Sequence, residues 1–414
     1  MPSSLTAEAA AERVARTSYG KLVAFLAARS RDVAAAEDAL AQAFAAALEQ
    51  WPRTGAPANP EGWLLTVARR KQIDAARRHR TGMLAEPHLQ LLAQDIAAAE
   101  GQLMAIPDQR LALMFACAHP AIDPAVRTPL ILQVVLGFDA AAIASAFLVS
   151  PSTMSQRLVR AKAKLKDGGI PFRVPEHEEL AERLDAVLDA IYACFTQGWS
   201  DPLGTESHAR GLSDESLWLG RLVADLLPEE PAALGLMALM LYAESRRAAR
   251  RDPQGGYVPL SQQDTALWDA AMIAEAETLV LRASRTERLG RFQLLAAIQS
   301  AHAVRRLSGQ TDWPAIVWLY DALYELTGSP VVAINRAVAV GEAQGAEAGL
   351  AALDKIGVDA SIEQYQPYWA ARAGLLARCH DNTAADQAYV LAIGLEQDPA
   401  VRAFLQMKRQ ALRQ

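Results

Sequence analysis

The stretch DAAAIASAFLVSPSTMSQRLVRAKAKLK, residues 139–166, decides the fold of the first half of the chain. It predicts two short helices around a tight turn, with Leu148 and Val149 as the connector. Ser150 is a good N-cap, and Pro151 stands at the first helical position, where its missing N–H costs nothing. The stretch therefore has the layout of a helix-turn-helix.

The second helix of this stretch has two different faces. Its apolar residues recur at helical spacing and form one stripe: Met154, Leu158, Ala161 and Leu165. Its cations fall on another face: Arg157, Arg160 and Lys164. The residues expected to brace it are Ile143, Phe147 and Val149. Such a helix fits a DNA-reading role; the alternative is a surface helix whose basic residues are merely solvated.

Composition indicates an all-α protein of two or three domains. The chain has 414 residues, too many for one ordinary core. Leucine and alanine dominate, and alternating strand patterns are rare. Residues 1–175 carry 20 Lys and Arg against 15 Asp and Glu, whereas the remainder carries 21 against 32. This asymmetry predicts that only the front half meets nucleic acid; the alternative is that the acidic half is simply soluble.

The cysteine pattern and the N-terminus predict a cytoplasmic protein. Cys117, Cys194 and Cys379 are far apart and odd in number, which argues against a disulfide framework. Cys117 and His119 lack a second pair at ligand spacing, so we expect no metal and no other cofactor. The N-terminal residues have no apolar signal core. The longest apolar run, Leu234–Ala243, is about half of what a membrane span needs, so we expect no membrane contact.

A second cationic block precedes the helix-turn-helix. Residues 32–51 predict a helix that Pro52 ends, and the connector 52–62, PRTGAPANPEG, is too rich in proline and glycine to be helical. The next stretch, WLLTVARRKQIDAARRHR (63–80), begins apolar and becomes densely cationic. Because its cations are faced by the single Asp74 and would repel one another, a nucleic-acid backbone partner is favoured over a solvated face.

Two DNA-binding blocks in this order resemble the sigma-70 family of bacterial RNA polymerase specificity subunits, and more narrowly its extracytoplasmic-function (ECF) group. AEDALAQAF (36–44) resembles region 2.2, which docks on the polymerase. GWLLTVARRKQIDAARR (62–78) resembles regions 2.3 and 2.4, which melt and read the −10 element. Residues 143–165 resemble region 4.2, which reads the −35 element. MFACAHPAI (114–122) and the long extension resemble a subgroup with a tetratricopeptide-like C-terminal domain.

The resemblance implies two partners, core RNA polymerase and promoter DNA, and assigns residues to each. The implied polymerase-docking residues are Glu37, Asp38 and Phe44. The implied melting and −10 residues are Trp63, Arg69, Arg70, Lys71, Arg77 and Arg78, with Trp63 supporting a base-capturing loop at 52–62. The implied −35 residues are Ser152, Thr153, Ser155, Gln156, Arg157 and Arg160.

The second half predicts further helices. The expected spans are Leu180–Gln197, Leu217–Leu227, Pro231–Arg247 and Thr265–Arg282. Arg246-Arg247 and Arg250-Arg251 form a basic cluster, expected to be salt-bridged rather than to touch polymerase or DNA. From Trp313 the pattern repeats at close to a tetratricopeptide helical-pair period, which predicts a groove for a protein or peptide partner. The alternative is a bundle that only packs.

The expected organisation is an all-α chain of several domains. The predicted ranges are region 2 at 1–80, a linker at 81–105, region 4 at 106–166, a second linker at 167–179, a helical extension domain at 180–290 and a tetratricopeptide-like domain at 291–414. In this organisation the extension regulates promoter-specific initiation and melting by the front half.

The sequence contains no catalytic motif, so we expect a protein that is not an enzyme. No stretch matches a phosphate-binding GxxxxGK[ST], a dinucleotide-binding GxGxxG or a nucleophile GxSxG, and Ala181 replaces the second histidine of an HExxH motif at His177. The main alternative function is a helix-turn-helix transcriptional regulator with a tetratricopeptide-like partner-sensing domain. Residues 36–80 count against it, because an ordinary repressor does not need them. An enzyme with a DNA-targeting front half is a weaker alternative.

Overall fold

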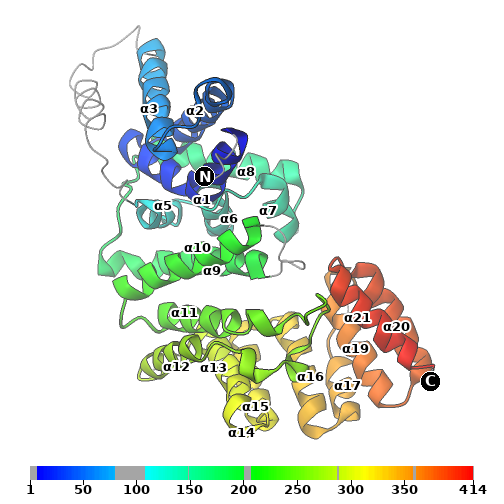
Figure 1. The fold of residues 1–414 in the computed structure, drawn as a ribbon. Helices are drawn as coiled ribbons and strands as arrows, with labels where there is room; N and C mark the ends of the chain where they lie inside the picture. Colours follow the sequence, from blue (N-terminus) through cyan, green and yellow to red (C-terminus); the bar gives the residue numbers. More distant parts are fainter. Residues whose placement is uncertain are drawn as a thin grey trace. The chain divides into compact units, whose positions relative to one another are not determined.

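The computed structural model describes residues 7–79, 108–147, 149–199, 207–286, 289–357 and 360–413. Within these ranges the chain is helical, with a single isolated β-bridge between Arg251 and Tyr257 and no strand, so the all-α prediction is confirmed (Figure 1). The chain divides into an N-terminal unit, Met1–Cys194, and a C-terminal unit, Phe195–Gln414. No helix in the described ranges is long and apolar enough to cross a membrane.

The first bundle consists of α1 (Ala7–Ser30), α2 (Val33–Thr54) and α3 (Pro60–His79), which all contact one another. Asp32 caps α2 by accepting a hydrogen bond from the backbone N–H of Ala35 at 3.0 Å. Trp51 of α2 is buried and meets Trp63 of α3 edge to face, with ring centroids 5.4 Å apart. These contacts fix α3 against the bundle.

The prediction that Pro52 ends α2 is wrong. The helix continues to Thr54, and Gly55, with φ of 79°, closes it. A proline in the last turn removes one intrahelical hydrogen bond, which a helix end tolerates better than a helix centre. The irregular connector therefore shortens to residues 55–59, because α3 begins at Pro60, where Asn59 accepts a hydrogen bond from the N–H of Gly62 at 3.0 Å.

The second bundle consists of α5 (Arg110–Cys117), α6 (Pro124–Val134), α7 (Ala140–Ala146) and α8 (Pro151–Asp167). α7 and α8 pack against each other, which confirms the predicted helix-turn-helix. Ser150 caps α8 through the N–H of Thr153, at 3.2 Å. The predicted apolar stripe of α8 is buried throughout: Met154, Leu158, Ala161 and Leu165.

One brace of the helix-turn-helix differs from expectation. Phe147 remains 38% exposed, whereas Ile143 and Ala144 are buried. The reason is position: Phe147 follows the last residue of α7, where the chain already turns toward Ser150. Leu148, half of the expected connector, and the linker expected at 81–105 both lie outside the described residues.

The two N-terminal bundles pack directly on each other. α5 lies between α1 and α6 and buries nearly every residue, including Met114, Phe115 and Cys117. Gly20 of α1 lies so close to the end of α6 that an added Cβ would stand 1.8 Å from the carbonyl oxygen of Val135. A side chain larger than hydrogen at residue 20 would therefore force the bundles apart.

α9 (His177–Trp199) follows α8, and the N-terminal unit ends within this helix, at Cys194. The segment that leads into it is packed, with Ile170 only 3% exposed. Arg127 of α6 is buried and donates a hydrogen bond to the carbonyl of Glu182 on α9 at 3.2 Å. The hydroxyl of Thr128 donates to the carbonyl of Ala186 at 3.4 Å. The first extension helix is thus anchored to the bundle that carries α8.

The C-terminal unit is a succession of packed helix pairs. Its longer helices are α10 (Ser207–Leu226), α11 (Pro231–Glu244), α12 (Ala270–Ala283), α13 (Arg291–Ala303), α15 (Trp313–Thr327), α16 (Pro330–Gln344), α19 (Gln366–Arg378), α20 (Asn382–Leu395) and α21 (Pro399–Ala411). α15 packs on α16 across a turn at Gly328, and α19 packs on α20. α11 stops at Glu244, before the expected Arg247, and a short 3₁₀ turn follows.

We expect Leu158→Ala to lower the free energy of unfolding of the N-terminal unit by about 2–4 kcal/mol, because it empties a fully buried site between α8 and its neighbours. Val159→Ala is the matched control, since Val159 is adjacent and 62% exposed, and we expect it to cost less than about 0.5 kcal/mol. Urea unfolding of both variants measures the difference. Equal losses would contradict the burial of this stripe.

Candidate nucleic-acid interface

The outer face of α8 presents polar and cationic side chains to solvent. Six residues of this face are assigned to DNA from the sequence, and all six are exposed: Ser152, Thr153, Ser155, Gln156, Arg157 and Arg160. The first four lie in the opening turns of the helix, where unpaired backbone N–H groups favour negative charge. Arg157 follows them directly, and Arg160 lies about one turn further on. The face can therefore contact base edges at its start and phosphates along its length.

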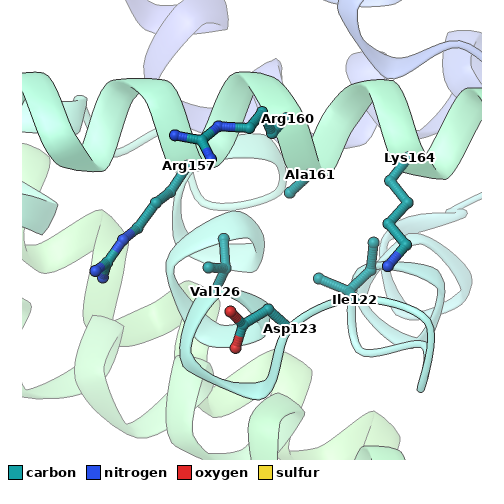
Figure 2. A pocket seen from close by; sticks show the side chains of 7 residues that line it. All are labelled: Ile122, Asp123, Val126, Arg157, Arg160, Ala161 and Lys164. Atoms are coloured by element: carbon teal, nitrogen blue, oxygen red, sulfur yellow. The ribbon is translucent and has the colours of Figure 1, made fainter.

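A pocket of about 150 Å³ lies beside this face, between α8 and the start of α6. Figure 2 shows Arg157, Arg160 and Lys164 projecting from α8, with Lys164 reaching down toward Ile122. Asp123 lines the same space and accepts a hydrogen bond from the N–H of Ala125 at 3.0 Å, so it also caps α6. The pocket thus combines several cations with one carboxylate, which gives it a net positive lining.

The second cationic surface lies on α3. Arg70 and Lys71 are exposed, and Trp63 lies half-buried against Trp51 at the start of the helix. Arg77 and Arg78 belong to the last turns of α3, but their side chains lie outside the described part of the chain. The described portion of α3 therefore offers two exposed cations about two turns beyond the aromatic pair.

Arg69 is placed differently from the expectation. It is only 8% exposed, and its guanidinium lies over the ring of Phe25 in α1, 4.8 Å from the ring centroid. A cation over an aromatic face is stabilised by the ring quadrupole. In this arrangement Arg69 braces α3 against α1 and does not face solvent as a phosphate contact would.

The docking residues assigned on α2 divide into accessible and paired positions. Asp38 is exposed and Phe44 is half-buried. Glu37, in contrast, forms an ion pair with Lys162 of α8 at 2.8 Å, and both side chains are largely covered. One turn further along α8, Lys166 pairs with Asp32 at 2.8 Å. One edge of α8 therefore rests on the helix assigned to polymerase docking.

Two buried groups near this ion pair have raised pKa values, chiefly because they are buried. Burial, together with the charges of Glu37 and Asp38, raises the pKa of Tyr19 to about 12. Burial and the charge of Glu37 also raise the pKa of the Cys117 thiol, while Lys162 lowers it. Both groups are neutral at physiological pH. The ion pair is therefore surrounded by the covered interior between the two bundles.

Comparison with known families assigns both bundles. Residues 15–81 match Sigma-70 region 2, and residues 112–165 match Sigma-70 region 4. The chain belongs to the sigma-70 family. The matched ranges coincide with the bundle of α1–α3 and the bundle of α5–α8, so α3 and α8 are the cationic helices of regions 2 and 4.

The relatives of the remainder of this sigma-70 family chain do not indicate its function. Residues 183–284 match a family of unknown function, DUF6596. An uncharacterized protein of Rhizobium meliloti (strain 1021), R00370, is 40% identical over 382 residues, which cover 90% of this chain and 89% of that protein. The similarity thus extends through the C-terminal unit. No solved structure matches the chain.

Several residues that shape this surface are not recognisable from the sequence. Lys162 and Lys166 read as further cations of the DNA-facing helix, yet both pair with carboxylates of region 2. Gly20 lies inside a helix, where its role at the bundle contact depends on a neighbour that is distant in sequence. The described residues contain no group of three or more His, Cys, Asp or Glu that could hold a metal.

We expect the double variant Arg157→Ala/Arg160→Ala to weaken binding to the duplex upstream of the chain's own gene. The plot of log K against log salt concentration should become shallower by about 1 for each phosphate that the variant no longer neutralises. Arg285→Ala, an exposed arginine of the C-terminal unit, is the control and should leave the slope unchanged. Fluorescence anisotropy at several salt concentrations measures both. An unaltered slope in the double variant would rule out phosphate contacts by this face.

Proposed function

We propose that this sigma-70 family chain is an ECF-group sigma factor that binds core RNA polymerase, directs it to a small set of promoters and helps to open them. Region 2 docks through the exposed part of α2, and α3 with the connector 55–59 engages the opening −10 element. Region 4 reads the −35 element through the outer face of α8. The observation that carries the proposal is the pairing, in one unit, of two cationic helices on separate bundles.

The opening step is supported by an aromatic group at the start of α3 and by cations further along this helix. Taking a base out of a duplex costs a few kcal/mol, which stacking and backbone cations offset. Trp63 offers a ring near the connector that Gly55 and Asn59 shape, and Arg70 and Lys71 offer cations about two turns further along α3. The chain needs no catalytic site of its own for this, because RNA synthesis belongs to the polymerase.

The proposed function requires the two bundles to separate. The −10 and −35 elements lie roughly 25 base pairs apart, on the order of 80 Å along B-form DNA at 34–36 Å per turn. In the structure α2 and α8 are in direct contact through Glu37–Lys162 and Asp32–Lys166. In this arrangement α3 and α8 cannot contact the −10 and −35 elements at the same time. We infer that the described form is the free protein and that docking releases Glu37.

The C-terminal unit is proposed to regulate this release. Its tetratricopeptide-like helix pairs suit a protein or peptide partner. α9 supports a physical route, since its first half packs on α6 through Arg127 and Thr128, next to the helix-turn-helix. Strain applied to α9 would therefore reach region 4 directly. This role distinguishes the chain from a sigma factor that consists of regions 2 and 4 alone.

We expect purified chain and core RNA polymerase to initiate RNA synthesis on the DNA upstream of the chain's own gene, where core enzyme alone does not. Asp38→Ala/Phe44→Ala should weaken binding to core enzyme about tenfold, because both side chains belong to the proposed docking face. Asp214→Ala, an exposed carboxylate of the C-terminal unit, is the control and should bind normally. Absence of both core binding and initiation by the unaltered chain would refute the function.

A further inference from the structure

Many described arginines of the C-terminal unit form ion pairs with carboxylates. The pairs that join neighbouring helices or turns include Arg221–Glu275, Arg336–Asp321, Arg372–Asp354, Arg378–Glu342 and Arg409–Asp386. Such ion pairs form readily in this unit, because its carboxylates outnumber its cations. Arginines held only by neutral partners are fewer in the described part of this unit, and two of them lie close to each other.

The two arginines are Arg246, which follows the end of α11, and Arg305, which begins α14 (Arg305–Ser308). Arg246 donates a hydrogen bond to the side-chain amide of Gln299 on α13 at 2.6 Å. Arg305 donates to the carbonyls of Ser261 and Gln263 at 2.7 and 2.8 Å, and its guanidinium lies 5.2 Å from the ring centroid of Trp268. All of these partners are neutral. The two guanidinium groups are thus held in place without having their charge compensated.

The charged groups that act on Arg246 and His302 include neighbouring arginines. Burial lowers the pKa of Arg246 to about 10, and the charges of Arg250 and Arg305 act in the same direction. Burial, Arg246 and Arg305 lower the pKa of His302 to about 4. Cations crowded in this way destabilise a fold unless something negative joins them.

The side chains of Arg246, His302 and Arg305 are partly covered and still reachable from solvent. Burial is the largest influence on Arg246 and His302, yet neither side chain is fully covered, and Arg305 is likewise only partly covered. A guanidinium has five N–H donors, and the hydrogen bonds above use few of them. Next along the chain, Arg251 bonds Asp398, but its Nη1 is buried without a hydrogen-bond partner in the described part of the chain.

We propose that Arg246, His302 and Arg305, here called the arginine–histidine cluster, bind a small molecule that carries a carboxylate or phosphate group. Planar guanidinium forks match both oxyanions in bidentate geometry. A small molecule is favoured over DNA, because the surrounding carboxylates of this acidic unit repel a long polyanion. The cluster would make the C-terminal unit a receptor for a metabolite, independently of whether the front half serves polymerase.

Isothermal titration of the full-length chain with inorganic phosphate, and separately with acetate, tests this site. We expect saturable binding of at least one of the two by the unaltered chain. Arg246→Gln should bind at least about tenfold more weakly, since glutamine cannot offer the anion a charged, bidentate donor. Arg221→Gln, which removes a carboxylate-paired arginine of the same unit, is the matched control and should bind like the unaltered chain.

Thermal unfolding without added anion gives a second readout. Arg246→Gln should melt no lower than the unaltered chain, because it relieves repulsion, whereas replacing a purely structural arginine would lower the melting temperature. Arg246→Lys keeps the charge and should bind with intermediate affinity. Absence of saturable binding, equal binding by Arg246→Gln, or displacement of phosphate by duplex DNA would each overturn the proposal.

Discussion

The contact between α1 and α5 constrains everything else in the N-terminal unit. α5 is short and buries almost all of its surface, which is possible only because α1 covers one side while α6 covers the other. Gly20 lets α1 approach the end of α6, and the ion pair Glu37–Lys162 lies in the covered region beside them. Regions 2 and 4 consequently form one compact body. Any activity that needs them apart must first break this contact.

In the proposed function, the ion pair between Glu37 of α2 and Lys162 of α8 couples polymerase docking to DNA reading. In the described form Glu37 pairs with Lys162 of region 4. In the proposed complex Glu37 contacts polymerase, so the two contacts exclude each other. The outer face of α8 is not involved, and its arginines remain exposed beside the pocket of Figure 2. DNA contacts can therefore form before or after the bundles part. α9 is anchored to α6 by Arg127, and this anchor is the route proposed for regulation by the C-terminal unit.

The helix-turn-helix is predictable from sequence, because its cap and its apolar stripe depend on residues close together in the chain. Ser150 and Leu158 are placed as expected. The all-α class and the two cationic helices follow from the same local patterns. Residues that depend on distant neighbours are not predictable in this way: Arg69 lies over Phe25, and Lys162 pairs with Glu37. A sequence pattern identifies a cation but not whether a carboxylate or an aromatic ring from another helix covers it.

The distance between regions 2 and 4 tests most directly whether docking must separate the two bundles. Fluorophores on exposed positions of α3 and α8 report it by single-molecule energy transfer in the full-length chain. We predict one high-transfer state for the free protein, and a low-transfer state, with a separation on the order of 80 Å, once core polymerase and promoter DNA are added. High transfer that persists in a complex shown to initiate RNA synthesis would contradict the required separation.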